Sequence, residues 1–593
     1  MIASRGEPSF LPVTIWSEWS DEAFQRARER RAPVLLFVRA AWCRWCRELE
    51  STVLADPRVA RVLEERFVCI QVDKDRRPDI DARYSKGGWP TLAWLDDEAE
   101  LLAADTYLEP DEMLARLELV ADYYARNRES IKTRIAEIER ERKAPQPAAR
   151  NRGRLGLEIV EHVARTIVDT ADPIHGGWGR EHKFPQAEAI DFALIRWSQT
   201  GDNAMLQLAT RTLRAMQAGE IHDTVEGGFY RYATQADWSV PHHEKMLDSN
   251  AQRLFAYLEA WQVLGDESFR ATARGILSFL YETLLDPKTG TFKGSQDANP
   301  AYAHLSTRSA RREFGSPACD PTVFTNWNAI TVSALFKSTA VLGEPRHAEQ
   351  ALRTLEFLRA EMVDERRGVY HYWDGNYHLP GMLSDHAYLL RALIDAAQHT
   401  GDVRYLHDAR KIADLSIEQL HSATGGFYDM AYDPSARGGL RLRNRSILEN
   451  AVMAEALLRL SALLRVDDYA DTARETLASF ADDYKRYGHF TAGYARAVDL
   501  LFHLPIHVTI VGPRSSALAV DLQRAALKPY VASRIVQILD PSDDASLLER
   551  SGLPHPKPGE SARAYVARGR ESYAETSDPA RLAALMTRVE RGG

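Results

Sequence analysis

Two cysteines stand three positions apart in Cys43-Arg44-Trp45-Cys46, directly after Trp42. An apolar run over residues 33–38 precedes them, and the residues that follow are predicted to form a helix. Two sulfurs in this spacing at a helix N-terminus can close a small disulfide. The helix dipole and the free backbone N–H groups there favour a thiolate on the first sulfur. The spacing therefore predicts a redox-active pair that exchanges disulfides.

The elements that must position this pair alternate between helices and strands. Residues 17–30, 59–65 and 110–142 are predicted helices, and a further helix runs from the cysteine pair to about residue 54. Residues 33–38, 67–73 and 92–95 are predicted strands, the last of them introduced by Gly87-Gly88-Trp89-Pro90. This β-α-β order with a proline before the third strand is that of a thioredoxin fold, which we assign to a first domain, residues 1–142.

Length and composition set limits on the rest of the chain. At 593 residues, two to four domains are expected. Hydrophobic residues make up 45% and charged residues 27%, as in globular proteins, and the formal charge is −9. This acidic balance excludes a basic nucleic-acid footprint, so we expect no nucleic-acid partner.

The N-terminal residues, the apolar runs and the number of cysteines bear on the cellular compartment. Residues 1–7 lack the apolar core of a signal peptide, and no apolar run approaches the roughly 18 residues that span a membrane. The four cysteines, Cys43, Cys46, Cys69 and Cys319, make no disulfide framework. We expect a cytoplasmic protein without a membrane partner, in which Cys69 is a buried small hydrophobe.

Residues 16–120 resemble a family of thioredoxin-domain proteins fused to an α-helical barrel, which includes the animal spermatogenesis-associated thioredoxin-domain proteins. The matching residues are Trp19, Glu22, Ala23, Phe24, Ala27, Pro33, Trp45, Cys46, Glu50, Phe67, Val68, Val72, Asp73, the run 77–81 and the run 87–90. The resemblance implies that Pro90 is a cis-proline beside the two sulfurs, and that the backbone of Trp89 pairs with a bound peptide or thiol. It implies no cofactor.

The chain departs from the usual pattern in two respects. Arg44 and Arg47 stand where the family has histidine, and their guanidinium groups would favour a thiolate more strongly than imidazoles. Phe37 stands where thioredoxins commonly carry an inward carboxylate, which removes that route of proton delivery. Two alternatives to a redox role stay open: a redox-silent fold kept as a scaffold, and a structural zinc site, which lacks a second Cys/His pair nearby. We expect no metal ion.

Residues 143–152, rich in proline and alanine, are a predicted linker. Beyond it, residues 153–504 alternate between glycine–aromatic loops, such as Gly227-Gly228-Phe229, and short polar turns, such as Thr400-Gly401-Asp402. The two kinds of loop interleave at a period of roughly 50–80 residues, which indicates a repeat architecture. Twelve predicted helices lie between them, over 154–170, 187–199, 203–219, 246–263, 267–285, 328–341, 346–363, 383–399, 403–420, 448–463, 467–486 and 495–503.

Twelve helices with long loops at one end and tight turns at the other describe an (α/α)6 barrel. The long loops meet at one rim, where we expect a cleft. The family resemblance continues here, most specifically over residues 222–252. Barrels of this type occur in N-acylglucosamine 2-epimerases and six-hairpin glycosidases, an analogy of fold. The candidate cleft residues are His222, Asp223, Arg231, Tyr232, His242, Glu244, Asp297, Trp327, Asn328 and His386.

Aromatic faces with carboxylates and amides suit a sugar. Glu244 and Asp297 could serve as acid and base in glycoside hydrolysis, or His242 and His386 could exchange a proton beside a carbonyl. The alternative is a purely structural role, in which these side chains only hold the loops to one another. Asn250, at the start of an apolar helix, is expected to be a core hydrogen-bonding residue.

The last segment, residues 505–593, is a predicted small α/β unit, with strands at 505–512 and 535–539 around a helix at 515–527. Relatives often carry cysteines in this segment, but this chain has none there. A redox relay from the first domain to the tail is therefore excluded.

Three functions follow from these features. The first is a thiol–disulfide redox protein in which the Cys43 thiolate attacks and Cys46 resolves, with the barrel supplying a cleft for a substrate or a protein thiol partner. The second is a carbohydrate-active enzyme, an epimerase or glycoside hydrolase acting on a small sugar, with a regulatory or structural thioredoxin domain. The third is a non-enzymatic binding scaffold.

Overall fold

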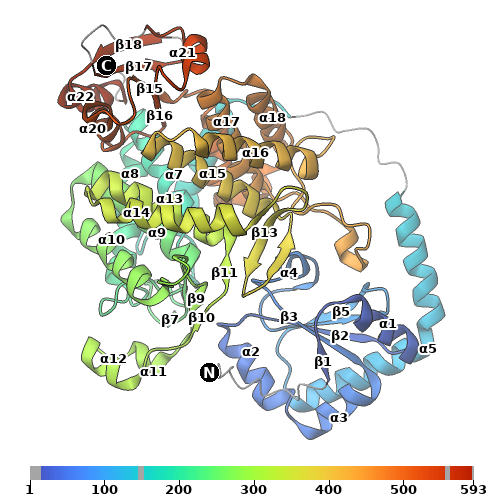
Figure 1. The fold of residues 1–593 in the computed structure, drawn as a ribbon. Helices are drawn as coiled ribbons and strands as arrows, with labels where there is room; N and C mark the ends of the chain where they lie inside the picture. Colours follow the sequence, from blue (N-terminus) through green and yellow to red (C-terminus); the bar gives the residue numbers. More distant parts are fainter. Residues whose placement is uncertain (1–14, 144–152, 555–560, 570, 591–593) are drawn as a thin grey trace. The chain divides into compact units, whose positions relative to one another are not determined.

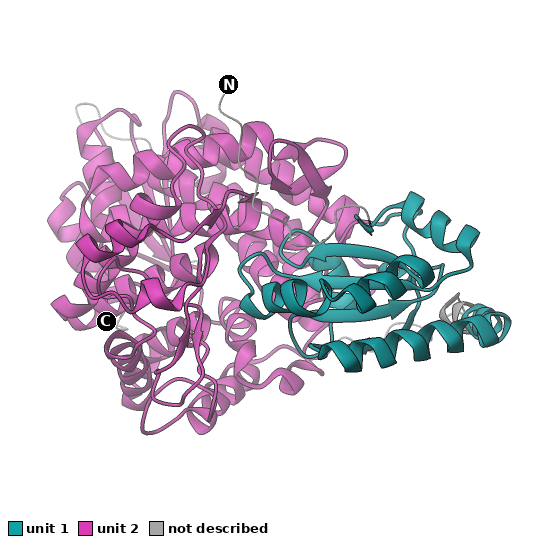
Figure 2. Ribbon diagram, turned by 90° about the horizontal axis from the view of Figure 1, so that it is seen from below, with its two compact units in different colours: residues 1–150, 432–443 teal, residues 151–431, 444–593 magenta. Residues whose placement is uncertain are grey.

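The computed structural model describes residues 15–143, 153–554, 561–569 and 571–590. The chain divides into two compact units, residues 1–150 with 432–443 and residues 151–431 with 444–593 (Figures 1 and 2). Apart from residue 143, the predicted linker lies outside the described residues.

A five-stranded sheet forms the centre of the first unit, in the order β1-β3-β2-β4-β5. Strands β1, β3 and β2 run parallel, whereas β4 pairs antiparallel with β2 and β5 antiparallel with β4. The strands are β1 (Trp16–Ser17), β2 (Val34–Arg39), β3 (Val68–Asp73), β4 (Thr91–Leu95) and β5 (Leu101–Asp105). The prediction missed β1 and β5, which lie at the two edges of the sheet, where short strands carry the weakest apolar pattern.

Helices cover both faces of this sheet. They are α1 (Asp21–Arg30), α2 (Arg44–Glu48), which continues as a π-helical turn (Leu49–Val53), α3 (Pro57–Arg66), α4 (Pro78–Tyr84) and α5 (Pro110–Lys143). The core on one face joins α1 and α4 to alternate residues of β2 and β3, such as Leu36 and Ile70. Their neighbours Leu35 and Cys69 face the other way and are also buried. Burial on both faces explains why β2 and β3 are continuous apolar runs.

One piece of the first unit comes from far along the sequence. Residues 432–443 pack on α4, and Leu440, only 6% exposed, joins the core that α1 and α4 share with the sheet (Figure 2). The Tyr84 hydroxyl donates to the Ala99 carbonyl at 2.8 Å and accepts from the Gly439 amide at 2.9 Å. We call residues 432–443 the clip. Its place in this unit gave no signal in the sequence, because the contact spans more than 300 residues.

Twelve long helices build the second unit and confirm the predicted set. Six of them form a closed ring in which each contacts the next and the last contacts the first: α7 (Ala187–Thr200), α9 (Leu247–Leu264), α13 (Thr325–Leu342), α15 (Leu383–Thr400), α17 (Ile447–Leu464) and α19 (Ala492–Asp499). Each ring helix packs against one outer helix: α8 (Asn203–Ala218), α10 (Glu267–Phe279), α14 (Pro345–Glu361), α16 (Arg404–Leu420), α18 (Asp467–Ala478) and α6 (Leu157–Thr170). This is an (α/α)6 barrel (Figure 1).

The inner and outer helices differ in how much of their surface is buried. The inner helices α13 and α17 have buried residues all round, whereas outer helices such as α6 and α10 bury a single stripe. The loops that enter the inner helices hold small extra elements, including α11 (Pro300–Ala303), α12 (Arg308–Phe314) and the hairpin of β13 (Gly368–Trp373) and β14 (Tyr377–Pro380).

The end of the chain forms the predicted α/β region. Its sheet has the order β16-β15-β17-β18, in which β15 and β16 are parallel and the other pairs antiparallel. Helices α20 (Ala517–Leu527) and α22 (Pro579–Glu590) share its core. The strands are β15 (Ile506–Val511), β16 (Arg534–Leu539), β17 (Arg563–Arg568) and β18 (Glu571–Thr576), and α21 (Ala545–Ser551) follows β16.

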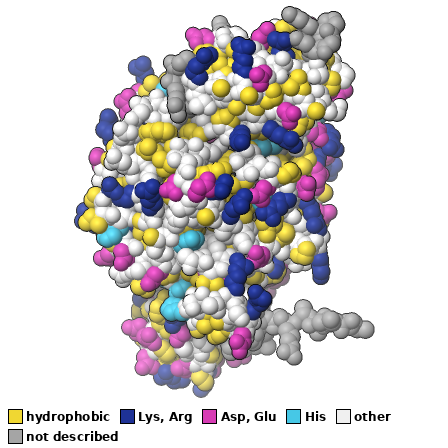
Figure 3. Space-filling model, turned by 90° about the vertical axis from the view of Figure 1, so that its left-hand side faces the viewer, with side chains coloured by type: hydrophobic (Ala, Val, Ile, Leu, Met, Phe, Trp, Pro, Cys, Tyr) yellow, Lys and Arg dark blue, Asp and Glu magenta, His cyan; other side chains and the backbone are white. Residues whose placement is uncertain are grey.

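Two surface properties bear on partners. Among the described residues, no helix has both the length and the apolar composition needed to cross a bilayer. On the face drawn in Figure 3, acidic and basic side chains are interspersed, and neither sign gathers into one field.

The clip supplies a first prediction. Gly438 has φ +49°, and a Cβ atom there would lie 1.9 Å from the Ala99 carbonyl oxygen. Because that oxygen belongs to the backbone, Gly438→Ala should displace the clip and speed hydrogen exchange at the Gly439 amide by about tenfold or more. Gly265→Ala is the matched control, since Gly265 is also left-handed (φ +67°) but has open space around it. Unchanged exchange in Gly438→Ala would contradict the described packing.

Candidate functional site

Cys43 and Cys46 lie in the first unit and are not joined in a disulfide. Cys43 caps α2, where its Sγ accepts a hydrogen bond from the Cys46 amide at 3.2 Å. The same Sγ lies 3.8 Å from the Trp89 carbonyl, which immediately precedes a cis peptide bond to Pro90. The expected cis-proline is thus confirmed, and Trp89 presents its backbone to the first sulfur.

The two thiols differ in environment. Cys43 is 6% exposed, whereas Cys46 is fully buried. Burial, together with the neighbouring Cys43, raises the pKa of the Cys46 thiol far above its ordinary value. The first sulfur therefore has the exposure and hydrogen bond of a nucleophile, and the second is held as a protonated thiol behind it.

Aromatic rings and one ion pair surround the first sulfur. Trp42 and Trp89 meet edge to face with ring centroids 5.9 Å apart, and the Lys74 ammonium group lies over both rings at 5.5 and 4.7 Å. Asp75 accepts from the Trp42 indole at 2.7 Å and pairs with Lys74 at 2.5 Å. Lys74 and Asp75 were not predicted; their position directly after β3, at the carboxyl end of a central strand, is the signal that could have found them.

The second thiol is influenced by a cation that was not predicted. Arg47 donates to the Ala41 carbonyl, and Arg44 lies on the exposed Trp45 ring. Arg39, on β2, is instead the cation that acts to lower the pKa of Cys46 against burial. Its Nε is 3.2 Å from Oε1 of the buried Glu50, which lies four residues after Cys46. Arg39 is thus an additional cation beside Cys46, and the effect of Arg44 and Arg47 on the thiolate of the motif stays a prediction.

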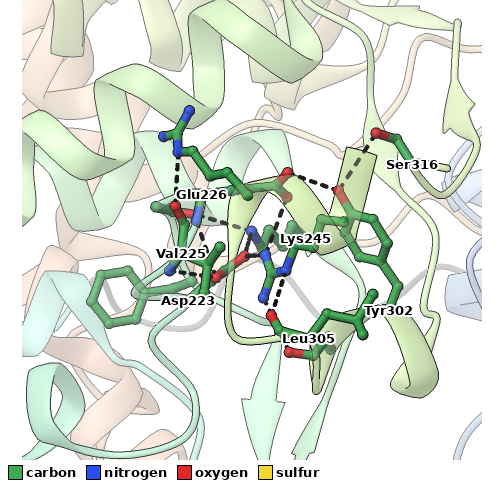
Figure 4. Close-up of polar contacts among 12 residues, drawn as sticks. Asp223, Val225, Glu226, Lys245, Tyr302, Leu305 and Ser316 are labelled. Carbon is green, nitrogen blue, oxygen red and sulfur yellow. Dashed lines mark hydrogen bonds and ion pairs between the residues drawn. The ribbon is translucent and has the colours of Figure 1, made fainter. Parts of the chain in front are cut away.

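In the barrel, Asp223 is the centre of a buried ionic cluster (Figure 4). Its Oδ2 accepts from Lys245 and, at 2.6 Å, from Arg311, which also reaches Glu226 at 3.1 Å. Tyr302 donates to Glu226 at 2.7 Å. Burial opposes ionisation of Asp223, but the two cations hold its pKa at about 2. This arrangement matches the interpretation that the side chain knits loops together.

The Asp223 loop is one of a repeated set. Asp172, Asp223, Asp286 and Asp364 each accept a hydrogen bond from the amide two positions ahead, and each precedes by four positions a glycine with positive φ. In two of these loops a buried lysine holds both the aspartate and the glycine carbonyl: Lys183 with Asp172 and Gly176, and Lys245 with Asp223 and Gly227.

The fourth residue of four inner helices clamps the glycine loop that precedes it. Asn250, Asn328 and Asn450 each accept from the amide and donate to the carbonyl of one phenylalanine, at 2.6–3.1 Å, namely Phe229, Phe292 and Phe427. His386 takes the same position in α15, and its Nε2 accepts from the Val369 amide at 3.0 Å. The expected core role of Asn250 is thus seen, and Asn328 and His386, predicted as cleft residues, have the same role.

Four other candidates do lie together. Tyr232 in β6 (Tyr232–Ala233) stacks on His242 in β7 (Pro241–His242) with ring centroids 4.4 Å apart. Arg231 lies over the Tyr232 ring and is 3.4 Å from the buried Glu244, whose Oε1 is 3.8 Å from His242. His222 lies apart from this set: it stacks on Phe229, and burial lowers its pKa.

The strand pairing bears on one of the two proposed acid–base pairs. Glu244 and Asp297 lie opposite each other, one step beyond the Lys245–Gln296 pair that joins β8 (Lys245–Met246) to β9 (Ser295–Gln296) in antiparallel register. The Asp297 amide donates to the Ala318 carbonyl, and Trp327 packs on Phe324. His386, of the second pair, is fully buried. Within the described part of the chain, no group of three or more His, Cys, Asp or Glu side chains could hold a metal ion.

Fold and site together define the class of protein. A thioredoxin-like unit with a C-x-x-C pair is joined to an (α/α)6 barrel, which continues into an α/β region. Residues 10–143 match the family model described as Thioredox_DsbH, a protein of unknown function, DUF255.

The similarity to curated proteins extends over nearly the whole chain. The spermatogenesis-associated protein 20 of Homo sapiens is 24% identical and aligns with 98% of this chain and 90% of its own length. The Mus musculus protein of the same name is also 24% identical, over 91% of this chain and 85% of its own. The resemblance predicted from the sequence is confirmed.

Solved structures are similar to the barrel in fold. A D-mannose isomerase aligns with 60% of this chain and 99% of its own, with a TM-score of 0.48 and 12% identity. The cellobiose 2-epimerase from Spirochaeta thermophila DSM 6192 aligns with 58% of this chain and 98% of its own, with a TM-score of 0.47 and 15% identity. At these identities the likeness is one of fold alone.

The clamp at His386 leads to a pH-dependent prediction. Because Nε2 accepts from Val369 and Nδ1 faces the Ser416 hydroxyl, the ring is neutral, and burial lowers its pKa from 6.5 to about 4. In the unfolded chain the ring takes up a proton below pH 6.5, so this contribution to stability is present above that pH and is lost as pH falls toward 4. The shift corresponds to about 3 kcal/mol.

His386→Gln keeps an acceptor for the Val369 amide but cannot titrate. Its free energy of unfolding should fall less than that of the wild type between pH 7 and pH 4.5. His386→Ala leaves the amide without its acceptor and should cost about 2 kcal/mol at pH 7. Urea unfolding at both pH values checks this; parallel pH profiles for wild type and His386→Gln would refute it.

Proposed function

We propose that this protein catalyses thiol–disulfide exchange through Cys43 and Cys46. The observation that carries the proposal is the asymmetry of the pair. Cys43 is slightly exposed, accepts a backbone hydrogen bond at the start of a helix and lies beside the Trp89 carbonyl, whereas Cys46 is fully buried.

The exchange proceeds in two displacements. The Cys43 thiolate attacks one sulfur of a substrate disulfide, a Cys43–substrate disulfide forms, and the other substrate sulfur leaves as a thiolate. Cys46 then loses its proton and attacks Cys43, which releases the second substrate thiolate and leaves a Cys43–Cys46 disulfide. The substrate gains two electrons and the pair loses two; dithiothreitol returns them in an assay.

The surroundings support both steps. The Trp89 carbonyl is placed to accept a hydrogen bond from the backbone of a bound peptide disulfide. The exposed Trp45 ring, 52% accessible, adds an apolar surface next to the first sulfur. Arg39 favours the Cys46 thiolate, which the second displacement requires and which burial opposes.

The variants Cys43→Ser and Cys46→Ser test the two roles. Cys43→Ser should lower the rate of insulin reduction in dithiothreitol by roughly a hundredfold or more, because a hydroxyl does not replace the thiolate. Cys46→Ser should still react with an aromatic disulfide reagent, but it should stop at a stable mixed disulfide, visible by mass spectrometry.

Cys319→Ser is the matched control. Cys319 lies in the barrel unit, and burial raises the pKa of its thiol to about 11, so its loss should leave both the reduction rate and the adduct unchanged. Reduction at the wild-type rate by Cys43→Ser, or an adduct on any cysteine other than Cys43, would sink the proposal.

A further inference from the structure

A pocket opens inside the barrel, among the first three turns of five inner helices. Its walls are Ala187, Glu188, Asp191, Ala251, Gln252, Phe255, Ala256, Ile330, Tyr388, Arg391 and Arg496. None of the ten predicted cleft residues is among them. The mixture of apolar walls with a few convergent polar groups is typical of small-molecule sites.

The four charged side chains of the pocket fall into two pairs: Asp191 and Arg496 form an ion pair, whereas Glu188 and Arg391 do not. Arg496 is engaged on both sides, by Asp191 and by Glu455. Glu188 and Arg391, in contrast, make no hydrogen bond or ion pair to any described residue. Arg391 only lies over the Phe255 ring, at 5.6 Å. A carboxyl group and a guanidinium group therefore line one pocket with their hydrogen-bonding capacity unused, which is costly unless a ligand or water supplies partners.

Backbone packing keeps Glu188 in this place. A Cβ atom on Gly493, in α19, would lie 2.9 Å from Oε2 of Glu188, so the absence of a side chain there admits the carboxyl group. Burial raises the pKa of Glu188 despite the nearby Arg496 and Arg391, which favours a ligand group that can both donate and accept.

The balance of charge selects the kind of ligand. The walls carry two acidic and two basic side chains, so an anion would meet Glu188 and Asp191, and a cation would meet Arg391 and Arg496. A hydroxyl group suits both open residues, since it can donate to the carboxyl group and accept from the guanidinium group. Phe255, Ile330 and three alanines provide apolar surface for carbon–hydrogen faces.

We propose that this inner pocket binds a neutral, polyhydroxylated small molecule, held by hydrogen bonds between its hydroxyl groups and the Glu188 and Arg391 side chains. Gln252 and the Tyr388 hydroxyl add further polar contacts along the wall. The site stands apart from the thiol–disulfide proposal, because no cysteine lines it.

Titration calorimetry on the full chain tests the proposal with a matched series of ligands. D-Glucose and myo-inositol are the neutral probes, the second of which has no carbonyl. D-Glucuronate adds a negative charge, D-glucosamine a positive one, and L-alanine is a zwitterion. The neutral probes should bind at millimolar concentration, and each of the other three more weakly. Absence of binding by both neutral probes, or tighter binding of any of the other three, would overturn the proposal.

Variants locate the site. Glu188→Gln and Arg391→Met should each weaken binding about tenfold or more, as the loss of a charge-assisted hydrogen bond does. Glu161→Gln, on the exposed face of α6, should bind as the wild type does. Gly493→Ala keeps the helix and pushes the Glu188 carboxyl group aside, so it should weaken binding even if Arg391→Met fails to fold. Wild-type affinity in both Glu188→Gln and Gly493→Ala would refute the assignment.

Discussion

The barrel depends on a hydrogen-bonded clamp between an inner helix and the loop that leads into it, which recurs in four of the six inner helices. In three hairpins an asparagine, four residues into the helix, satisfies both the amide and the carbonyl of a buried phenylalanine. A buried loop would otherwise carry unpaired backbone groups at a high free-energy cost. With the loops fixed, the inner helices can close a ring that holds the pocket at its centre.

The same clamp explains which parts of the fold the sequence could predict. The twelve helices and the glycine–aromatic loops are local patterns, and all twelve predicted helices are present, although α18 ends eight residues before the predicted 486 and α19 begins three residues before the predicted 495. The roles of Asn328 and His386 are not local, because a polar residue near a helix start looks the same whether it faces a cleft or a loop. Their shared fourth position in successive helices was the available signal.

In the two candidate sites, too, some residues could be predicted from local sequence and others could not. The pair Cys43 and Cys46 follows from spacing and neighbours alone, whereas the place of the cis-proline Pro90 beside it follows from the family resemblance. Arg39 and Glu50 lie on different elements, and their approach depends on how β2 packs against the helix after the motif. Glu188 and Arg391 are about two hundred residues apart in the chain, and only closure of the helix ring makes them neighbours in one pocket.

The clip gives the chain an unusual topology. Because Leu440 completes the core beside α4, the first unit is discontinuous, and no single cut separates the two units along the chain. A gene fragment that ends after α5 would encode Cys43 and Cys46, but it would leave an apolar slot open to solvent next to Tyr84. Exchange of this domain between proteins by recombination therefore carries a penalty that a simple tandem arrangement avoids.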